Sequence, residues 1–521
     1  MVTPAFIGVT MARRGLLRPG SPARVARQLW SLRRWGFGLA GEVRQAAARS
    51  PDRVAVVDDT GLSLTYAALL DRATRVAHAI SDSIVAGDRV GVLCRNSAGM
   101  LATLVGVAQL GADPVLINTG LPAAQLAELI TAQNLSLIVH DDEFDGVPAG
   151  VGLPASVLES RLAQVSPTPL RPPPRPSRTI VLTSGTTGTP KGARRPTPGG
   201  FGPLCSIVDR IPLRHGARVL IAAPLFHTWG FATMQIALAL RATIVLRRRF
   251  DPAAILDDLT THRCGALIAI PVMLQRLLEV PPPTLDVPLA HRPALDVVAV
   301  SGSALPGGLA TRFMDRFGDV LYNLYGSTEV SWASIATPAD LRAAPDTAGR
   351  PPHGTTITVL DAAGNVVPPG ASGRLFVHND MLFEGYTSAA TGGQPSGPQG
   401  LPTGDLGHLD ESGRVFVDGR EDDMIVSGGE NVFPSQVENL LADRPEIREV
   451  AVIGVPDDEY GQRLAAYVVL HPAKSLTEEQ IRDHVRRHRA RFCVPRDVVF
   501  LAELPRTTTG KVLTRLLGPP R

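Results

Sequence analysis

Short apolar runs alternate with segments of helical periodicity from residue 62 to about residue 330. Leu69, Ala73, Val76 and Ile80 recur at helical spacing, and the mostly apolar run over 89–94 that follows them predicts a buried strand. Similar runs predict strands over 112–117, 135–139, 179–182, 219–223, 266–270 and 296–300. Because strands that alternate with helices pair in parallel, the pattern predicts an α/β fold whose large N-terminal domain has mainly parallel sheets flanked by helices.

The pattern changes after residue 418. Two strands are predicted over 450–453 and 466–470, and Thr477 with Gln480 forms the capping-box pattern that opens a helix. This shorter alternation predicts a small α+β C-terminal domain. The predicted division is an N-terminal extension over 1–40, an N-terminal domain over 41–418, a hinge over 419–423 and a C-terminal domain over 424–521. The proline-rich stretch 167–176 predicts an extended linker, and the stretch 388–400 predicts a surface loop.

The N-terminal extension is basic and amphipathic. Ser21 is a suitable helix cap, Pro22 suits the first helical position, and an apolar stripe follows at Val25, Leu29 and Leu32. Arginines occupy most of the opposite face, which is typical of a helix that lies on an anionic bilayer. A surface helix that packs its stripe against the rest of the protein explains the same pattern, so both interpretations remain open.

Composition limits the partners. Residues 1–50 carry nine arginines and one acid, so the other 471 residues sum to −5, and this acidic body without a basic stripe argues against nucleic acid. The cysteines are scattered without a C-x-x-C pair, which gives no metal or disulfide signature and suits a reducing compartment. No window reaches the length of a membrane span. We expect a cytoplasmic protein, with peripheral contact at the inner membrane face if the helix binds lipid.

Two of the three lysines lie in the segments that carry most chemistry, although 49 of the 52 basic residues are arginine. Lys191 closes the turn 183–192, whose glycines and hydroxyls suit a polyphosphate, and Lys511 lies near the C-terminus in a similar Thr-rich, Gly-containing stretch. The turn is not a Walker P-loop, because Pro190 and Gly192 occupy positions where that motif needs glycine and a hydroxyl. A lysine kept against this bias points to a compact, mobile charge.

Other motifs follow in order along the chain. They are 224–230 (Pro-Leu-Phe-His-Thr-Trp-Gly), 301–303 (Ser-Gly-Ser), 325–329 (Tyr-Gly-Ser-Thr-Glu), 403–405 (Thr-Gly-Asp), 419–434 and Lys511. In this order and spacing, over residues 40 to 518, the chain resembles the adenylate-forming superfamily of acyl-CoA synthetases, luciferases and nonribosomal adenylation domains.

The resemblance implies a role for each matching position. Lys511, Glu329 and His227 are the implied catalytic residues, and Thr186 with Glu329 would bind Mg²⁺. Tyr325 would stack on adenine and Asp405 would accept the ribose hydroxyls. The implied positions for the nucleotide and CoA are Thr183, Ser184, Gly185, Thr186, Thr187, Gly188, Lys191, Ser301, Gly302, Ser303, Tyr325, Gly326, Ser327, Thr328, Asp405, Arg420, Gly428 and Gly429.

The resemblance also implies a two-step reaction. ATP converts a carboxylic acid to an acyl-adenylate with release of pyrophosphate, and CoA then displaces AMP to give the thioester. The small C-terminal domain is mobile in this family and would turn near Asp422 between the steps, so that Lys511 withdraws and the segment with Gly428 and Gly429 arrives.

The acid pocket is expected to be apolar. No acidic residue occurs in 226–229, where relatives that activate amino acids carry an aspartate. The expected lining is Trp229, Phe231, Met234, Val330 and Trp332. Such a pocket suits a fatty or aryl acid, and a medium- or long-chain fatty acid is our first expectation. The alternatives are an acyl-AMP ligase that loads a carrier protein and, of a different class, a non-catalytic nucleotide or lipid sensor.

Overall fold

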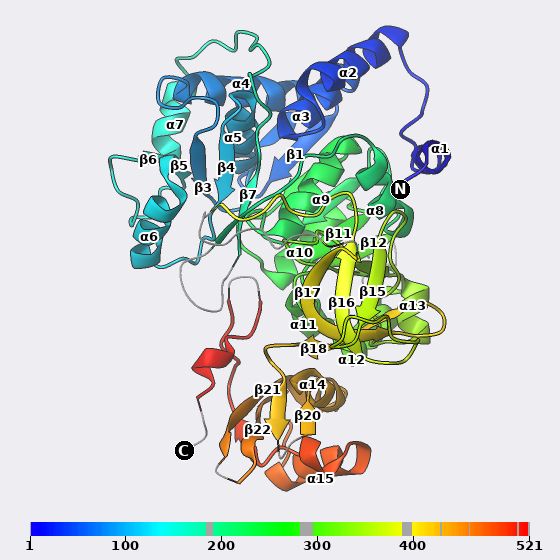
Figure 1. Cartoon of the computed structure of the whole chain (residues 1–521). Coiled ribbons are helices and arrows are strands. Elements are labelled where there is room, and N and C mark those ends of the chain that lie inside the picture. Colours follow the sequence, from blue (N-terminus) through cyan, green and yellow to red (C-terminus); the bar gives the residue numbers. More distant parts are fainter. Residues whose placement is uncertain are drawn as a thin grey trace.

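The computed structural model describes residues 2–183, 191–281, 295–387, 397, 399–427, 430–457, 459–507 and 510–518, with the backbone alone at 183 and 431. A large N-terminal domain carries three sheets, and a smaller C-terminal domain carries a fourth and lies below it in the view of Figure 1. The predicted α/β class is confirmed.

The largest sheet has eight strands, and its inner strands are parallel. In spatial order the strands are β14 (Ser334–Ala336), β13 (Leu321–Tyr325), β12 (Val297–Val300), β11 (Ala266–Ala269), β9 (Arg218–Ile221), β10 (Thr243–Leu246), β1 (Val54–Asp58) and β2 (Ser63–Thr65). Strands β10, β11 and β12 are buried along their whole length, because helices cover the sheet there. Its helices are α8 (Gly202–Arg210), α9 (Thr228–Ala239), α10 (Pro252–Thr261), α11 (Pro271–Glu279), α12 (Gly307–Phe317) and α13 (Pro338–Ala343).

The second sheet has six strands and is parallel except at β8. In spatial order its strands are β6 (Gly152–Pro154), β5 (Leu135–His140), β3 (Arg89–Leu93), β4 (Asp113–Leu116), β7 (Ile180–Thr183) and β8 (Lys191–Arg194). The helices of this part of the chain are α4 (Tyr66–Ile80), α5 (Ala98–Gln109), α6 (Ala123–Gln133) and α7 (Ala155–Leu162). The seven strands predicted up to residue 300 are all present within two residues at their ends.

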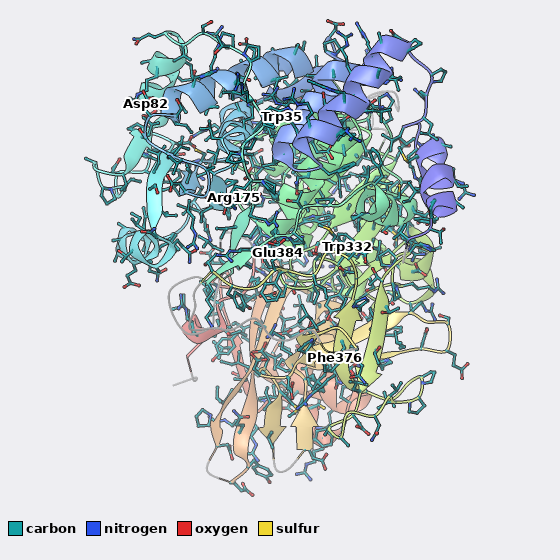
Figure 2. The ribbon with its side chains drawn as sticks, turned by 45° about the horizontal axis from the view of Figure 1, so that its top comes forward. Trp35, Asp82, Arg175, Trp332, Phe376 and Glu384 are labelled. Carbon is teal, nitrogen blue, oxygen red and sulfur yellow. The ribbon has the colours of Figure 1, made fainter. Side chains whose placement is uncertain are left out.

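The third sheet is antiparallel and was not predicted. It consists of β15 (Thr356–Leu360), β16 (Gly373–His378), β17 (Leu401–Leu409) and β18 (Val415–Arg420). Arg178, two residues after the proline-rich linker, pairs at 2.7 Å with Glu384, which follows β16 and is labelled in Figure 2.

The C-terminal domain has its own core and a five-stranded sheet. Its elements are β19 (Ile425–Ser427), β20 (Glu430–Val432), α14 (Pro434–Ala442), β21 (Ile447–Asp457), β22 (Gly461–Leu470), α15 (Glu478–His488), the short helix Arg491–Cys493, β23 (Asp497–Phe500) and the short helix Thr514–Leu516. The capping box predicted at Thr477 and Gln480 is confirmed at the start of α15, because each side chain bonds the other residue's backbone N–H.

The N-terminal extension packs on the large domain. Helix α1 (Pro4–Arg13) lies against α8, and α2 (Pro22–Trp35) lies against α3 (Leu39–Arg49), with Trp35 at its end (Figure 2). Leu32 is buried in this contact, whereas Leu29 and Trp30 are 58% and 56% exposed. Ser21 precedes α2 as predicted, although its hydroxyl makes no capping hydrogen bond. The stripe is therefore divided between a packed side and an open side.

Three composition-based expectations can be compared with the described part of the chain. All four cysteines are unpaired and buried. In the same residues, no three His, Cys, Asp or Glu side chains gather closely enough to hold a metal ion by themselves. None of the described helices has both the length and the apolar character that a membrane crossing requires.

Candidate active site

Tyr386 contacts both Lys191 and Glu329. The predicted phosphate turn leaves β7 at Thr183 and re-enters β8 at Lys191, and these two residues pair across the strands. Ser184, Gly185, Thr186, Thr187 and Gly188 lie outside the described residues. The Lys191 ammonium is 5.8 Å from the ring centre of Tyr386, whose hydroxyl donates to Glu329 Oε1 at 2.9 Å. Tyr386 therefore links Lys191 to the carboxylate that the resemblance assigns to Mg²⁺.

The predicted turns at 301–303 and 325–329 follow β12 and β13. These strands are parallel neighbours, so both turns lie at the same edge of the large sheet. Gly302 has φ +99°, and a Cβ there would lie 3.9 Å from His227 Cε1. Ser301 is buried and Ser303 is partly exposed. The first turn and His227 therefore face each other across a short distance.

The 325–329 turn is held by its own polar groups. Ser327 Oγ accepts hydrogen bonds from the backbone N–H groups of Glu329 and Val330, both at 3.2 Å. Any Cβ at Gly326 would collide with the Ser331 carbonyl, so glycine is required there. The Thr328 hydroxyl lies 3.0 Å from the Thr228 hydroxyl at the start of α9. These contacts tie the turn to the helix that follows His227.

Arg195 is a buried residue of the site that the sequence analysis missed. Its Nη1 donates to the Thr328 carbonyl at 2.7 Å. Burial lowers the pKa of Arg195 to about 10, and the charge of Glu329 acts in the opposite direction. The sole sequence signal was its position four residues after Lys191. Because the chain has 49 arginines, that position alone does not distinguish Arg195 from the others.

Tyr325, Asp405 and Arg420 form a continuous polar group. The Tyr325 hydroxyl donates to Asp405 Oδ2 at 2.5 Å, and Asp405 pairs across β17 and β18 with Arg420, whose Nη1 is 3.9 Å from Asp405 Oδ1. Burial raises the pKa of Asp405, opposed by the Tyr325 hydrogen bond and by the charges of Arg420 and Lys511. Burial, followed by the Asp405 charge, raises the pKa of Tyr325. The structure therefore brings together three residues separated by up to 95 positions of sequence.

Lys511 reaches this same region from the C-terminal domain. The turn that carries it closes through a hydrogen bond from the Thr507 N–H to the Lys511 carbonyl at 2.8 Å. Gly510 has φ +81°, and a Cβ there would lie 2.7 Å from Val272 Cγ1 of the large domain. Burial and, second, the charge of Lys511 lower the pKa of His227 to about 4. Lys511 therefore lies close enough to act electrostatically on both His227 and Asp405.

The residues expected to line the acid pocket lie in two apolar regions of the large domain. Trp229, Phe231 and Met234 on α9 are buried in the main core, and Trp229 Nε1 donates to the Ala269 carbonyl at 3.0 Å. Val330 belongs to a separate apolar cluster beside Tyr325, and Trp332 Nε1 donates to Thr355 Oγ1 at 3.0 Å. Side-chain direction on α9 separates Phe231 from Trp229, and sequence position alone cannot reveal it.

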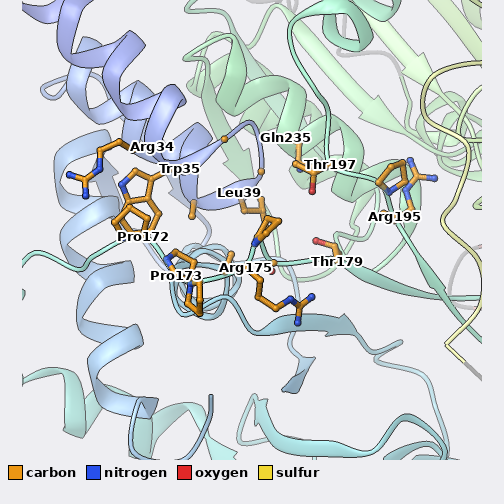
Figure 3. A pocket seen from close by; sticks show the side chains of 18 of the residues that line it. Arg34, Trp35, Leu39, Pro172, Pro173, Arg175, Thr179, Arg195, Thr197 and Gln235 are labelled. Carbon is orange, nitrogen blue, oxygen red and sulfur yellow. The ribbon is translucent and has the colours of Figure 1, made fainter. Parts of the chain in front are cut away.

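Phe231 on α9 lines a cavity of about 230 Å³. The cavity also touches Gln235 and Arg195 and extends to Trp35 at the end of α2 and Leu39 at the start of α3 (Figure 3). It therefore links the surroundings of Thr328 with the N-terminal helices.

The remaining predicted positions concern the hinge and the glycine segment. Asp422 follows β18, is exposed, and lies 3.4 Å from Arg420 Nη2. Gly428 and Gly429 lie outside the described residues.

Family models match both parts of the chain. The model described as AMP-binding enzyme matches residues 43–387, and the model described as AMP-binding enzyme C-terminal domain matches residues 436–511. The chain belongs to the AMP-binding enzyme family. This membership confirms the resemblance inferred from the motifs.

Curated relatives include several CoA ligases. The indoleacetate–CoA ligase of Aromatoleum aromaticum is 31% identical over 90% of this chain and 94% of its own length. A feruloyl-CoA synthase of an Amycolatopsis species is 30% identical over 91% and 97%. The long-chain-fatty-acid–CoA ligase FadD13 of Mycobacterium tuberculosis is 27% identical over 91% and 97%. The predicted enzyme class, an AMP-forming acid–thiol ligase that uses ATP and CoA, is confirmed.

Solved structures agree with the fold. ATP-bound MatB from Rhodopseudomonas palustris has a TM-score of 0.82 and 27% identity, and the match covers 92% of this chain and 98% of that one. The predicted combination of a large N-terminal and a small C-terminal domain is confirmed by this match.

Proposed function

We propose that the protein activates an apolar carboxylic acid, with aromatic acids as the preferred class, to an acyl-adenylate and then transfers the acyl group to CoA. The observation that carries this proposal is the convergence of three groups around the turn that follows β13: Lys511, the Tyr325–Asp405 pair, and Lys191 with Glu329, which both contact Tyr386. A non-catalytic sensor would not need a lysine from a second domain at this place.

ATP would occupy the space between these groups. The carboxylate of Asp405 is oriented by the Tyr325 hydroxyl and offers its remaining acceptor capacity to the ribose diol. The 183–191 turn, with Thr183, Thr186 and Lys191, would hold the β- and γ-phosphates. Arg420, beside Asp405, would support the ribose.

The residues fit Mg²⁺ bound together with ATP. Mg²⁺ prefers oxygen ligands and usually takes one or two from protein and others from phosphate and water, so a site without a three-residue cluster is suitable. Glu329 offers one carboxylate, one oxygen of which is held by Tyr386, and Thr186 would supply a hydroxyl. Bound there, Mg²⁺ would neutralise phosphate charge.

In the first step, an oxygen of the substrate carboxylate attacks the α-phosphorus and pyrophosphate leaves. Negative charge grows on the phosphate oxygens, and the Lys511 ammonium stabilises it at a preorganised position. His227 is neutral at pH 7, because its pKa is about 4, so it adds no second positive charge at the mouth of the acid pocket.

In the second step, the CoA thiol attacks the acyl carbon and AMP leaves with the bonding electrons. Lys511 has no task in this step, and a turn of the C-terminal domain at Asp422, within the hinge 419–423, would withdraw it. Gly428 and Gly429 would then line the approach of the thiol, since backbone without Cβ atoms leaves room for a narrow substituent.

Aromatic acids are preferred because the relatives with the higher identities are named for indoleacetate and ferulate. A medium- or long-chain fatty acid is the second candidate. The cavity that runs from Phe231 toward Trp35 supports it, since a long tail could extend there from the site (Figure 3). The relative named for long-chain fatty acids is less similar.

Peripheral contact with an anionic membrane at the inner face, by a protein otherwise in the cytoplasm, remains part of the proposal. Leu29 and Trp30 are exposed on α2 beside exposed Arg33 and Arg34, and the Arg34 guanidinium lies 4.6 Å from the Trp30 ring centre. Apolar side chains among arginines suit the interface of an anionic bilayer.

One acid panel tests the proposal. Purified protein is supplied with ATP, Mg²⁺ and aryl, arylalkanoic, fatty or amino acids, and acid-dependent ATP–pyrophosphate exchange and CoA consumption are measured. Exchange with CoA consumption supports the ligase, and exchange without it points to a carrier-protein ligase. No exchange with any acid refutes the proposal in favour of a sensor, and an amino acid preference refutes the pocket interpretation.

A further inference from the structure

Two ion pairs join the domains beside the Lys511 turn. Arg448 at the start of β21 makes a two-point contact with Glu279 at the end of α11, with Nε–Oε1 and Nη2–Oε2 distances of 2.7 and 2.9 Å. The next residue, Glu449, lies 3.3 Å from Arg276 Nη2 on the same helix. Each side of the interface therefore contributes one cation and one anion: Arg276 and Glu279 on α11, and Arg448 and Glu449 on β21.

A local irregularity of β21 makes this double contact feasible. Successive side chains of a regular strand point to opposite faces, so Arg448 and Glu449 could not both meet one helix. The register of β21 against β22 shifts between Ile447 and Glu449, which leaves Arg448 unpaired in the ladder. A bulge of this kind re-aims a side chain, and here both charges face α11.

The same carboxylate also holds the Lys511 turn. Arg506 donates to Glu449 Oε2 from Nε at 3.2 Å and from Nη2 at 2.9 Å, and its Nη1 donates to the Gly510 carbonyl at 2.6 Å. The side chain of Glu449 is 5% exposed, and these partners supply the hydrogen bonds that a buried carboxylate needs. An unbroken path of polar contacts thus runs from Arg276 of the large domain to the residue before Lys511.

The two arginines on Glu449 belong to different domains. A turn of the C-terminal domain separates Arg276 from Glu449 and Arg448 from Glu279, but it leaves the Arg506–Glu449 pair intact. The Lys511 turn can therefore keep its shape in either orientation, whereas its position over the nucleotide depends on the contacts with α11.

We infer that Arg276 and Glu279, with Arg448 and Glu449, form an ionic latch that positions Lys511 for the adenylation step. The latch residues are positioning residues, since they act through Lys511 and its turn. The inference rests on the proposed role of Lys511 in the first step and adds the residues that set its position.

The first experiment compares half-reactions in Arg276→Ala. Acid-dependent ATP–pyrophosphate exchange should fall about tenfold, which is a moderate loss because Arg276 is itself partly exposed. Thioester formation from supplied acyl-adenylate and CoA should stay within about twofold of the wild type. Arg276 pairs with two carboxylates, Glu279 at 3.4 Å and Glu449 at 3.3 Å. Arg342→Ala is the matched control, because Arg342 pairs with Asp315 and Asp319, both within the large domain. Equal loss in both half-reactions, or no loss in either, overturns the latch.

A charge exchange guards against simple misfolding. Glu279→Arg and Arg448→Glu should each reduce pyrophosphate exchange, and the double variant should be more active than either single one. A double variant no more active than the better of the two single variants overturns the latch. Lys511→Ala distinguishes the two failures: if it lowers both half-reactions equally, the proposed function fails, whereas if it is selective and Arg276→Ala is not, the latch alone fails.

Discussion

Asp405 offers the sharpest test of how the nucleotide is held. Asp405→Asn keeps the size of the side chain and an oxygen that can accept the Tyr325 hydroxyl, which now approaches at 2.5 Å, but it removes the negative charge. If Asp405 binds the ribose diol, the variant loses a charge-assisted hydrogen bond. Such a bond contributes about 1.5–3 kcal/mol, and the amide still offers a neutral acceptor, so the lower end of this range applies.

The expected result is an approximately tenfold weaker affinity for ATP, since about 1.4 kcal/mol corresponds to a factor of ten. One effect works in the other direction, because removing a negative charge reduces repulsion of the phosphates. Arg420 at 3.9 Å and the charge of Lys511 already offset the Asp405 charge, so this relief is the smaller effect.

The assay is calorimetric titration of ATP and of 2′,3′-dideoxy-ATP into the wild type and the variant without acid. The wild type should bind the dideoxy analogue more weakly than ATP. Asp405→Asn should bind the dideoxy analogue with the same affinity as the wild type does. If the substitution weakens both ligands equally, Asp405 acts on the fold and the reasoning is refuted. Asp361→Asn, in an exposed turn after β15, serves as the control and should bind both ligands like the wild type.

Three further predictions concern other parts of the chain. Lys511→Ala should reduce ATP–pyrophosphate exchange by about 10²–10³-fold while thioester formation from supplied acyl-adenylate is largely kept; equal loss would contradict its role. The folded pKa of His227 is about 4, below the unfolded value, so the unfolded chain binds more protons than the folded one between about pH 4 and 6.5. The free energy of unfolding should therefore decrease as the pH is lowered from about 6.5 to about 4. Thermal unfolding of His227→Asn should show a smaller decrease over this range, and an identical decrease would remove this contribution. Leu29→Ser with Trp30→Ser should reduce flotation with anionic liposomes without changing catalysis, and unchanged flotation would exclude this surface; these exposed positions are preferable to deleting residues 1–40, because α2 packs on α3 through the buried Leu32.

Local patterns that depend on near neighbours were predicted well. Strands β10, β11 and β12 at the centre of the largest sheet are buried along their whole length and almost entirely apolar, because helices cover them, and this pattern can be recognised in the sequence without knowledge of the fold. The capping box at Thr477 and Gln480 involves residues three positions apart, so its geometry is contained in a single helical turn. The antiparallel sheet β15–β18 was not predicted, because its strands are only partly buried and their apolar pattern is irregular.

Side-chain direction in the expected acid pocket is a feature that the sequence alone does not show. Trp229 and Phe231 are two residues apart on α9, which places them on different sides of the helix. One donates to the Ala269 carbonyl within the core and the other lines the cavity toward Trp35. Positions close together in the sequence therefore have different surroundings in the structure, and the acid-binding role of these residues stays a prediction.

The sequence by itself determined the class of chemistry, because glycines, hydroxyls, carboxylates and two retained lysines in a fixed order identify the family without coordinates. Only the tertiary structure decided which distant charges meet. Arg276 and Glu449 are 173 positions apart, and nothing in either local sequence distinguishes them from the other charged residues of the chain. Their pairing arises from the docking of one domain on another and from one bulge in β21, and such contacts depend on packing across the whole molecule.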